Sequence, residues 1–207
     1  MSLSAGEVDN LKHAPSVEGV LPIFHHRWSA RAFADRDVSP ATLAKVFEAA
    51  RWAPSSNNEQ PWRFLVGVRN SSTYQEIEST LVGFNKSWAG AAPVLILGVA
   101  GAKFSRNGNP NGYAFYDLGA ASAYLTLQAA ALGLTAHQMA GYDHDAAKTV
   151  LGIPEDYVLG SVIALGYQGE PATLSNQELI AREVAPRDRK PLKEMVYSAW
   201  DVPAELG

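Results

Sequence analysis

The side chains best suited to chemistry lie in the loop 53–62, which reads Ala-Pro-Ser-Ser-Asn-Asn-Glu-Gln-Pro-Trp. Its serines, asparagines and glutamine offer many hydrogen-bond donors and acceptors within a short stretch, which suits binding of a polar small molecule. The same side chains can bond their own backbone, so a well-capped turn explains the loop equally well when it is considered alone. Its two prolines and crowded polar groups favour a binding loop over a simple connection.

A second set of donors precedes this loop in residues 27–33, Arg-Trp-Ser-Ala-Arg-Ala-Phe. Arg27 and Arg31 carry planar, permanently charged guanidinium groups, which suit a phosphate or carbonyl oxygens, and Ser29 lies between them. A pair of solvated surface arginines is the ordinary alternative. This segment makes binding of an anionic ligand a hypothesis that depends on the rest of the chain.

Two regular elements are predicted on either side of the polar loop. Ser39 can cap a helix that begins at Pro40, with apolar residues at helical spacing until Pro54 ends it. Residues 62–69 alternate between two faces, as a strand does. The loop therefore lies between two rigid elements that can fix its position.

A predicted helix over residues 113–132 is apolar almost all round, and Gly133 follows it as a stop. A helix without a polar face must be buried on all sides, at the centre of a domain or across a subunit interface. In a chain of 207 residues, the subunit interface is the more attractive explanation.

The other elements follow from caps, breakers and apolar runs. Residues 1–16 are expected to form a polar leader. Residues 101–112 are rich in Gly and Asn and should form a mobile surface loop, either a cover for a substrate site or a plain connection. Capping-box sequences begin at Ser72 and Ser175, and Gly152 should stop a helix. The remaining predicted elements are a short helix over 17–26, a buried strand over 93–100, a helix over 143–151, a strand over 158–167 and a helix over 191–200.

Length, charge and composition limit the possible classes of protein. A chain of 207 residues suits one domain, 1–207, and its net charge of −4 argues against a nucleic-acid partner. The absence of cysteine excludes thiol catalysis and disulfides, and the five histidines show no metal-ligand spacing. No dinucleotide-binding, P-loop or nucleophile-elbow motif occurs. The apolar run 91–100 is too short to span a bilayer, so we expect a cytoplasmic protein with no membrane partner.

Three blocks together carry a family resemblance: Arg-x-Ser-x-Arg-x-Phe from Arg27, Ala-Pro-Ser-Ser-x-Asn-x-Gln-Pro-Trp from Ala53, and Arg-Asp-Arg-Lys-Pro from Arg187. In order and spacing they resemble the nitroreductase family of FMN-dependent oxidoreductases, from Leu21 to Tyr197. The resemblance implies an α+β fold with a central mixed, mostly antiparallel sheet flanked by helices. It also implies an interlocked homodimer with two identical flavin sites at its interface.

The resemblance further implies which residues bind FMN. Arg27 corresponds to the arginine that binds the phosphate, with Trp28 and Ser29 along the ribityl phosphate. Arg31 corresponds to the cation beside N1 and O2 of the isoalloxazine ring, where a positive charge stabilises the reduced flavin. Lysine is common at that position, and arginine would be a more rigid donor.

Other cofactor contacts are implied later in the chain. Asn85 resembles the asparagine at the pyrimidine edge of the flavin, although a polar residue at a helix end explains it equally well. Ala140 and Gly141 align with the segment whose backbone N–H groups point at N5 and O4. Many relatives carry glutamate there, so Ala140 keeps the backbone role and lacks an acidic group. Arg187 and Arg189 should complete the phosphate clamp, against the alternative of a basic tail.

The polar loop is expected to serve the other subunit of the homodimer. Pro54, Ser55, Ser56 and Asn58 should close over that subunit's flavin. Aromatic residues could line an open slot for nicotinamide and acceptor. The candidates are Phe84, Trp88, Tyr113, Phe115 and Tyr116.

The expected activity is a ping-pong cycle. NADH or NADPH delivers hydride to N5 of FMN, and a small-molecule acceptor then takes the electrons; nitroaromatics, quinones and free flavin are the expected acceptors. No side chain need act as a general acid or base. The alternatives are redirected flavin chemistry, as in dehydrogenase-like or dehalogenase-like relatives, and a flavin-binding regulatory protein with little turnover.

Overall fold

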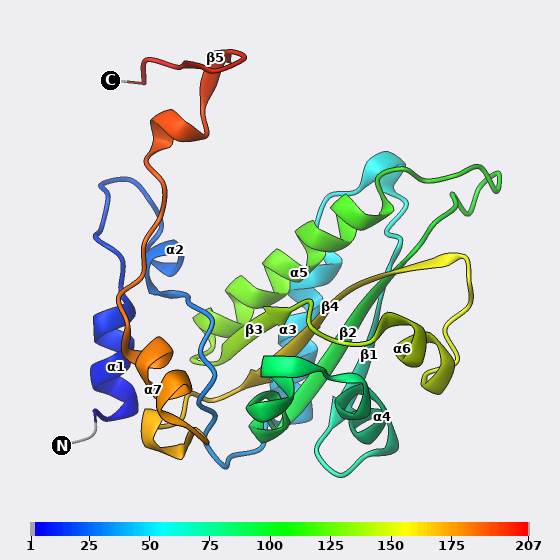
Figure 1. The fold of residues 1–207 in the computed structure, drawn as a ribbon. Coiled ribbons are helices and arrows are strands. Elements are labelled where there is room, and N and C mark those ends of the chain that lie inside the picture. Colours follow the sequence, from blue (N-terminus) through cyan, green and yellow to red (C-terminus); the bar gives the residue numbers. More distant parts are fainter. Residues whose placement is uncertain (1–2, 207) are drawn as a thin grey trace.

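A four-stranded antiparallel sheet forms the centre of the molecule in the computed structural model, which describes residues 3–206 (Figure 1). Its order is β1 (Trp62–Val68), β2 (Val94–Gly101), β4 (Tyr157–Gly166) and β3 (Thr135–Met139). Every residue of β2 except the last is buried, which explains its unbroken apolar sequence. We expected a mixed, mostly antiparallel sheet, whereas every pairing between these four strands is antiparallel.

Helices cover both faces of this sheet. Neighbouring residues of a strand point to opposite faces, so Ile96 packs with helices α3 and α5, while Leu95 packs with α4 and α6. The two apolar clusters that result make the molecule a helix–sheet–helix sandwich (Figure 1). The four helices are α3 (Pro40–Arg51), α4 (Ser72–Thr80), α5 (Ala114–Ala131) and α6 (His144–Val150).

The predicted signals at the ends of several helices are confirmed. The hydroxyl of Ser39 accepts the Thr42 N–H and caps α3. Gly133 and Gly152 follow α5 and α6 with φ of 74° and 63°, a left-handed conformation that favours glycine.

Other boundaries differ by one or a few residues. Ser71 caps α4 in place of Ser72, and Asn176 caps α7 (Gln177–Val184) in place of Ser175. Adjacent polar residues could each serve as the cap, and the backbone geometry selects one. The predicted helix over 17–26 contains only α2 (Pro22–His26), α3 ends at Arg51 before Pro54, and β3 was not predicted.

The N-terminal residues, expected to be a polar leader, contain helix α1 (Ala5–Lys12). A capping box between Ser4 and Glu7 begins this helix, and Val8 is fully buried. α1 packs against α7 beside the central sandwich (Figure 1). A single buried apolar residue in a polar stretch gives too weak a period for sequence reasoning to detect. Residues 1 and 2 of the expected leader lie outside the described part.

The predicted helix over 191–200 is wrong. The chain instead makes a 3-10 turn at Leu192–Glu194 and a hairpin of β5 (Tyr197–Ala199) and β6 (Val202–Pro203), with Asp201 in a left-handed conformation (φ 57°). This arm extends away from the rest of the chain (Figure 1) and is exposed along almost its whole length. A helix there would have no apolar surface of this chain to pack against, and isolated short helices are unstable.

Among residues 3–206, no helix is both long and apolar enough to cross a membrane. In the same part of the chain, no three His, Asp or Glu side chains are grouped as metal ligands.

Candidate cofactor-binding site

The segment from Arg27 to Ala32 is extended and presents its polar side chains on one side. Trp28, Ala30 and Ala32 are buried, whereas Arg27, Ser29 and Arg31 between them are half-buried. This alternation is that of a strand at the surface, because successive side chains of extended backbone point in opposite directions. The two arginines and the serine therefore lie on one face, as a ligand-binding segment requires.

Two buried groups hold this segment in place. The carboxylate of Glu183, on α7, accepts the N–H groups of Arg31 at 2.8 Å and Ala32 at 2.9 Å. The Nδ1 of His137, on β3, donates to the carbonyl oxygen of Ala30 at 3.0 Å. Burial raises the pKa of the Glu183 carboxyl, opposed by the two backbone N–H groups, and burial lowers the pKa of His137 to about 4. His137 is therefore neutral at pH 7.

Three arginines gather at the beginning of the segment. Arg187 donates to the backbone carbonyls of Arg27 and His25, which brings the basic block near the C-terminus against residues 25–27. Burial lowers the pKa of Arg27, and the charges of Arg187 and Arg189 lower it further. Since like charges repel, this arrangement favours binding of an anion among them.

The side chain of Trp28 is held by helix α1. Its ring is 6% exposed and packs with Val8, and its Nε1 donates to Asp9 at 3.0 Å. The indole N–H is thus already used by α1. The indole N–H therefore does not point at a ribityl phosphate, the group that the sequence resemblance placed beside Trp28.

Asn85 and Gly141, two residues expected to bind the flavin, are in direct contact. The Nδ2 of Asn85 donates to the carbonyl oxygen of Gly141 at 3.2 Å. A Cβ added at Gly141 would lie 2.5 Å from that Nδ2, so only glycine permits this approach. Ala140 follows the end of β3 and is exposed.

The polar loop has a strained and well-anchored backbone. Asn57, Asn58 and Gln60 have φ of 54°, 54° and 52°, which is uncommon for residues other than glycine. The N–H of Ser56 donates to the carboxylate of Asp117 at 3.0 Å, and Asp117 is only 3% exposed. Strain of this kind persists where the surroundings hold it, which is typical of functional loops.

The polar loop and the arginine segment lie at opposite ends of α5. Ser56 contacts Asp117, near the start of this helix, whereas Arg27 lines a cavity with Ala130 and Gly133, at its end. At 1.5 Å per residue, the two ends are roughly 20 Å apart. One chain therefore does not bring the two halves of the expected site together.

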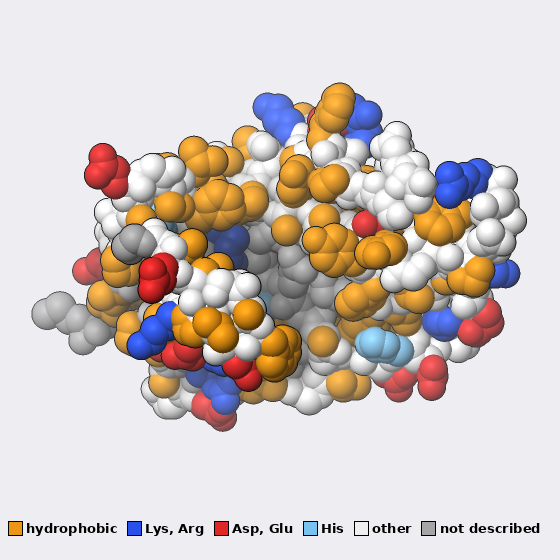
Figure 2. Space-filling view, turned by 90° about the horizontal axis from the view of Figure 1, so that it is seen from above, with side chains coloured by type: hydrophobic (Ala, Val, Ile, Leu, Met, Phe, Trp, Pro, Cys, Tyr) orange, Lys and Arg blue, Asp and Glu red, His pale blue; other side chains and the backbone are white. Residues whose placement is uncertain are grey.

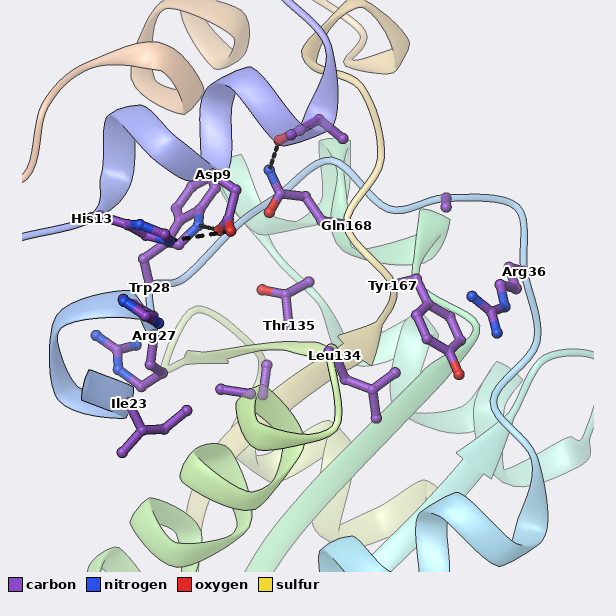
Figure 3. A pocket seen from close by; sticks show the side chains of 17 residues that line it. Asp9, His13, Ile23, Arg27, Trp28, Arg36, Leu134, Thr135, Tyr167 and Gln168 are labelled. Atoms are coloured by element: carbon purple, nitrogen blue, oxygen red, sulfur yellow. Dashed lines mark hydrogen bonds and ion pairs between the residues drawn. The ribbon is translucent and has the colours of Figure 1, made fainter. Parts of the chain in front are cut away.

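The cavity beside Arg27 has a volume of about 560 Å³ (Figure 3). Asp9 accepts from Trp28 and pairs with His13 along one wall, and Thr135 lies between this wall and Tyr167 (Figure 3). The residues expected at the flavin ring do not line it.

The aromatic candidates for a substrate slot lie in three different surroundings. Trp88 is buried against His137, with ring centroids 4.5 Å apart, so it belongs to the core. The ring of Phe84 lies 5.7 Å from the guanidinium carbon of Arg31. Tyr113, Phe115 and Tyr116 are exposed at the start of α5. Figure 2 shows apolar side chains gathered around a hollow on the face seen from above.

Sequence reasoning missed the three residues that support the site. His137 bonds to Ala30, 107 positions away, and Glu183 bonds to Arg31, 152 positions away, and no local pattern marks such pairs. Asp117 had a detectable signal, because it is the one charged residue in the apolar helix α5. A lone carboxylate in an apolar helix requires a partner when it is buried.

Known proteins are similar to this chain over most of its length. The model of the nitroreductase family matches residues 25–167. A protein of Archaeoglobus fulgidus named "Putative NADH dehydrogenase/NAD(P)H nitroreductase" is 32% identical, over 73% of this chain and 86% of that protein. The NADH dehydrogenase of Thermus thermophilus is 26% identical, over 81% of this chain and 98% of that protein. A solved structure of an oxidoreductase containing FMN superposes with a TM-score of 0.82 at 31% identity, covering 89% of this chain and 93% of the other.

These matches identify the class of protein. The chain belongs to the nitroreductase family, is an oxidoreductase and has the fold of that family. The family resemblance carried by the three sequence blocks is thus confirmed.

Proposed function

We propose that this chain uses FMN to carry electrons from NADH or NADPH to small organic acceptors such as nitroaromatics, quinones or free flavin. The observation that carries the proposal is the cluster of Arg27, Arg187 and Arg189 beside the segment that presents Arg31. Arginines bind phosphate through charge-assisted hydrogen bonds, and a cation next to a flavin favours its reduction. The FMN-containing relative at 31% identity supports the choice of cofactor.

Unused donors in the site fit such a cofactor. The Nε atoms of Arg31 and Arg187 are both buried and lack a hydrogen-bond acceptor among the described residues. Buried donors left unpaired are costly, so a ligand that accepts from them would stabilise the protein. Arg27, Arg187 and Arg189 would hold the phosphate, and Arg31 and Asn85 would hold the pyrimidine edge of the ring.

The chain's own residues bind and orient the reactants. When bound, FMN supplies the ring that takes hydride from the nicotinamide and returns electrons to the acceptor. Ala140 has no polar side chain, so at this position only the backbone can form a hydrogen bond to the ring. A ping-pong cycle follows if nicotinamide and acceptor take turns in one open slot beside Phe84.

We place the complete site between two copies of this chain. Pro54, Ser55, Ser56 and Asn58 of one copy would close over the flavin that the arginine segment of the other holds. The solvent-facing side of α5 supports this arrangement, because it is apolar or small at Phe115, Gly119, Ala123 and Tyr124. A helix face of this composition needs a partner to bury it.

The arrangement can be tested by complementation. Arg27→Ala and Asp117→Ala would each impair both sites of a homodimer. In a mixed dimer, one site would combine the intact arginine segment of one chain with the intact loop of the other. Activity regained after the two variants exchange subunits supports a shared site, and no recovery despite proven exchange contradicts it.

The cofactor and the activity are tested by one spectrum. The purified protein, loaded with FMN, should show a bound-flavin visible spectrum that bleaches when NADH or NADPH is added without oxygen. Failure to bind FMN would refute the cofactor. Bound flavin that neither nucleotide reduces would refute the reductase activity and favour a flavin-binding role.

A further inference from the structure

Glu183 is fully buried, although glutamate is among the residues least often found inside a protein. One carboxylate oxygen accepts the N–H groups of Arg31 at 2.8 Å and Ala32 at 2.9 Å, and the other lies 3.1 Å from the Arg31 nitrogen. These contacts offset the cost of burying a charged group. They also fix the backbone of Arg31 from a helix that lies 152 positions later in the sequence.

The same carboxylate lies near the charge of Arg31. The Nη1 of Arg31 is 4.0 Å from Oε2 of Glu183, and the rings of Phe84 and Trp88 lie 5.7 Å and 5.8 Å from its guanidinium carbon. The Nε of Arg31 is buried without an acceptor among residues 3–206. The guanidinium is therefore held by protein groups while keeping a donor for a ligand.

We propose that Glu183 is a positioning residue, which holds Arg31 beside the flavin and reduces the positive charge that the ring experiences. The proposal rests on the proposed function, since it takes Arg31 as a neighbour of bound FMN. A cation at the pyrimidine edge favours the reduced ring because that ring carries negative charge, and a counter-charge close to the cation weakens the effect. Glu183 would thus make the flavin harder to reduce than Arg31 alone would.

The midpoint potential of bound FMN tests this role. Glu183→Gln keeps one acceptor oxygen for the backbone and removes the charge, so the potential should become more positive. Arg31→Gln should make the midpoint potential more negative. Glu183→Gln should change the potential less when it is added to the Arg31→Gln variant than when it is made in the wild-type protein. The matched control is Glu155→Gln, which removes an exposed carboxylate paired with Lys148 and should leave the potential unchanged. An unchanged or more negative potential in Glu183→Gln would overturn the proposal.

Hydrogen exchange of the flavin-free protein tests the positioning without the cofactor. Glu183→Ala should speed exchange at the amides of Arg31 and Ala32 about tenfold, because each loses its acceptor, while the amides of β4 keep their rates. Unchanged rates at Arg31 and Ala32 would overturn the proposal even if Glu183→Gln failed to bind FMN. A wild-type protein that does not bind FMN would instead refute the proposed function. The exchange rates would still show whether Glu183 fixes the backbone of Arg31 and Ala32.

Discussion

Acid should destabilise the fold through His137, the histidine that holds the segment 27–32. Its ring is 9% exposed, and burial lowers its pKa from 6.5 to about 4. The unfolded chain therefore binds a proton more readily than the folded chain between these pH values. The stabilising contribution is fully present above pH 6.5 and is lost as pH falls toward 4.

The size of this effect follows from the shift. At 1.36 kcal/mol per pKa unit, the whole contribution is about 3 kcal/mol, of which about 2 kcal/mol should be lost by pH 5. Urea unfolding at fixed protomer concentration, followed by tryptophan fluorescence from pH 7.5 to pH 5, measures it. The wild-type free energy of unfolding should fall more steeply with acid than that of His137→Gln, whose amide can still donate to Ala30 but does not titrate.

A control separates this effect from the titration of other groups. His144 is exposed on α6, so His144→Gln should retain the wild-type pH dependence. If wild type and His137→Gln lose stability in parallel between pH 7.5 and pH 5, His137 is not buried in its neutral form and the reasoning fails.

Three further substitutions test the placement of the cofactor residues, each by FMN titration monitored through flavin fluorescence. Asp117→Ala should weaken FMN binding roughly ten- to a hundredfold, because the N–H of Ser56 loses a charged acceptor worth ~1.5–3 kcal/mol. Asp117→Asn should recover most of the affinity. Equal affinities in the wild-type protein and both variants would show that the bond between Ser56 and Asp117 does not support FMN binding. Gly141→Ala should displace Asn85 and weaken binding while the far-UV circular dichroism stays unchanged, and unaltered affinity would show that their contact is unimportant for the flavin. Arg189→Ala should weaken FMN binding roughly ten- to a hundredfold with an intact fold, whereas affinity equal to the parent would remove Arg189 from the phosphate clamp.

Local patterns predicted the elements that carry their own signal. The cap at Ser39, the alternation of residues 62–69 and the stop at Gly133 each depend on a few neighbouring residues, and each is found in the structure. The strand β3 was missed because Thr-Ala-His-Gln-Met has no clear alternation, although four of its five residues are buried at the sheet edge. Its burial comes from α5 and from the segment 27–32, which are distant in sequence.

The failed prediction at the C-terminus has a related cause. The apolar residues of the arm do recur, yet Leu192, Met195 and Trp200 remain 61%, 52% and 91% exposed. A helical pattern predicts a helix only if some surface buries its apolar side. No surface of the single chain buries the apolar side chains of the arm. Apolar residues that contact another subunit would recur for a different reason, and sequence reasoning would then wrongly predict a helix.

The three sequence blocks predict one binding site, and the structure explains why they are so far apart in the chain. The arginine segment and the block near the C-terminus meet at one end of α5, where Arg187 contacts Arg27, whereas the polar loop is anchored at the other end through Asp117. A twofold axis passing near the middle of α5 would lay two copies of this helix side by side in opposite directions. The start of each helix would then lie beside the end of the partner's helix, and two equivalent complete sites would form. Under the proposed arrangement, the apolar side of α5 and the separation of the two groups of residues would share one explanation, a homodimer whose subunits each supply half of both sites.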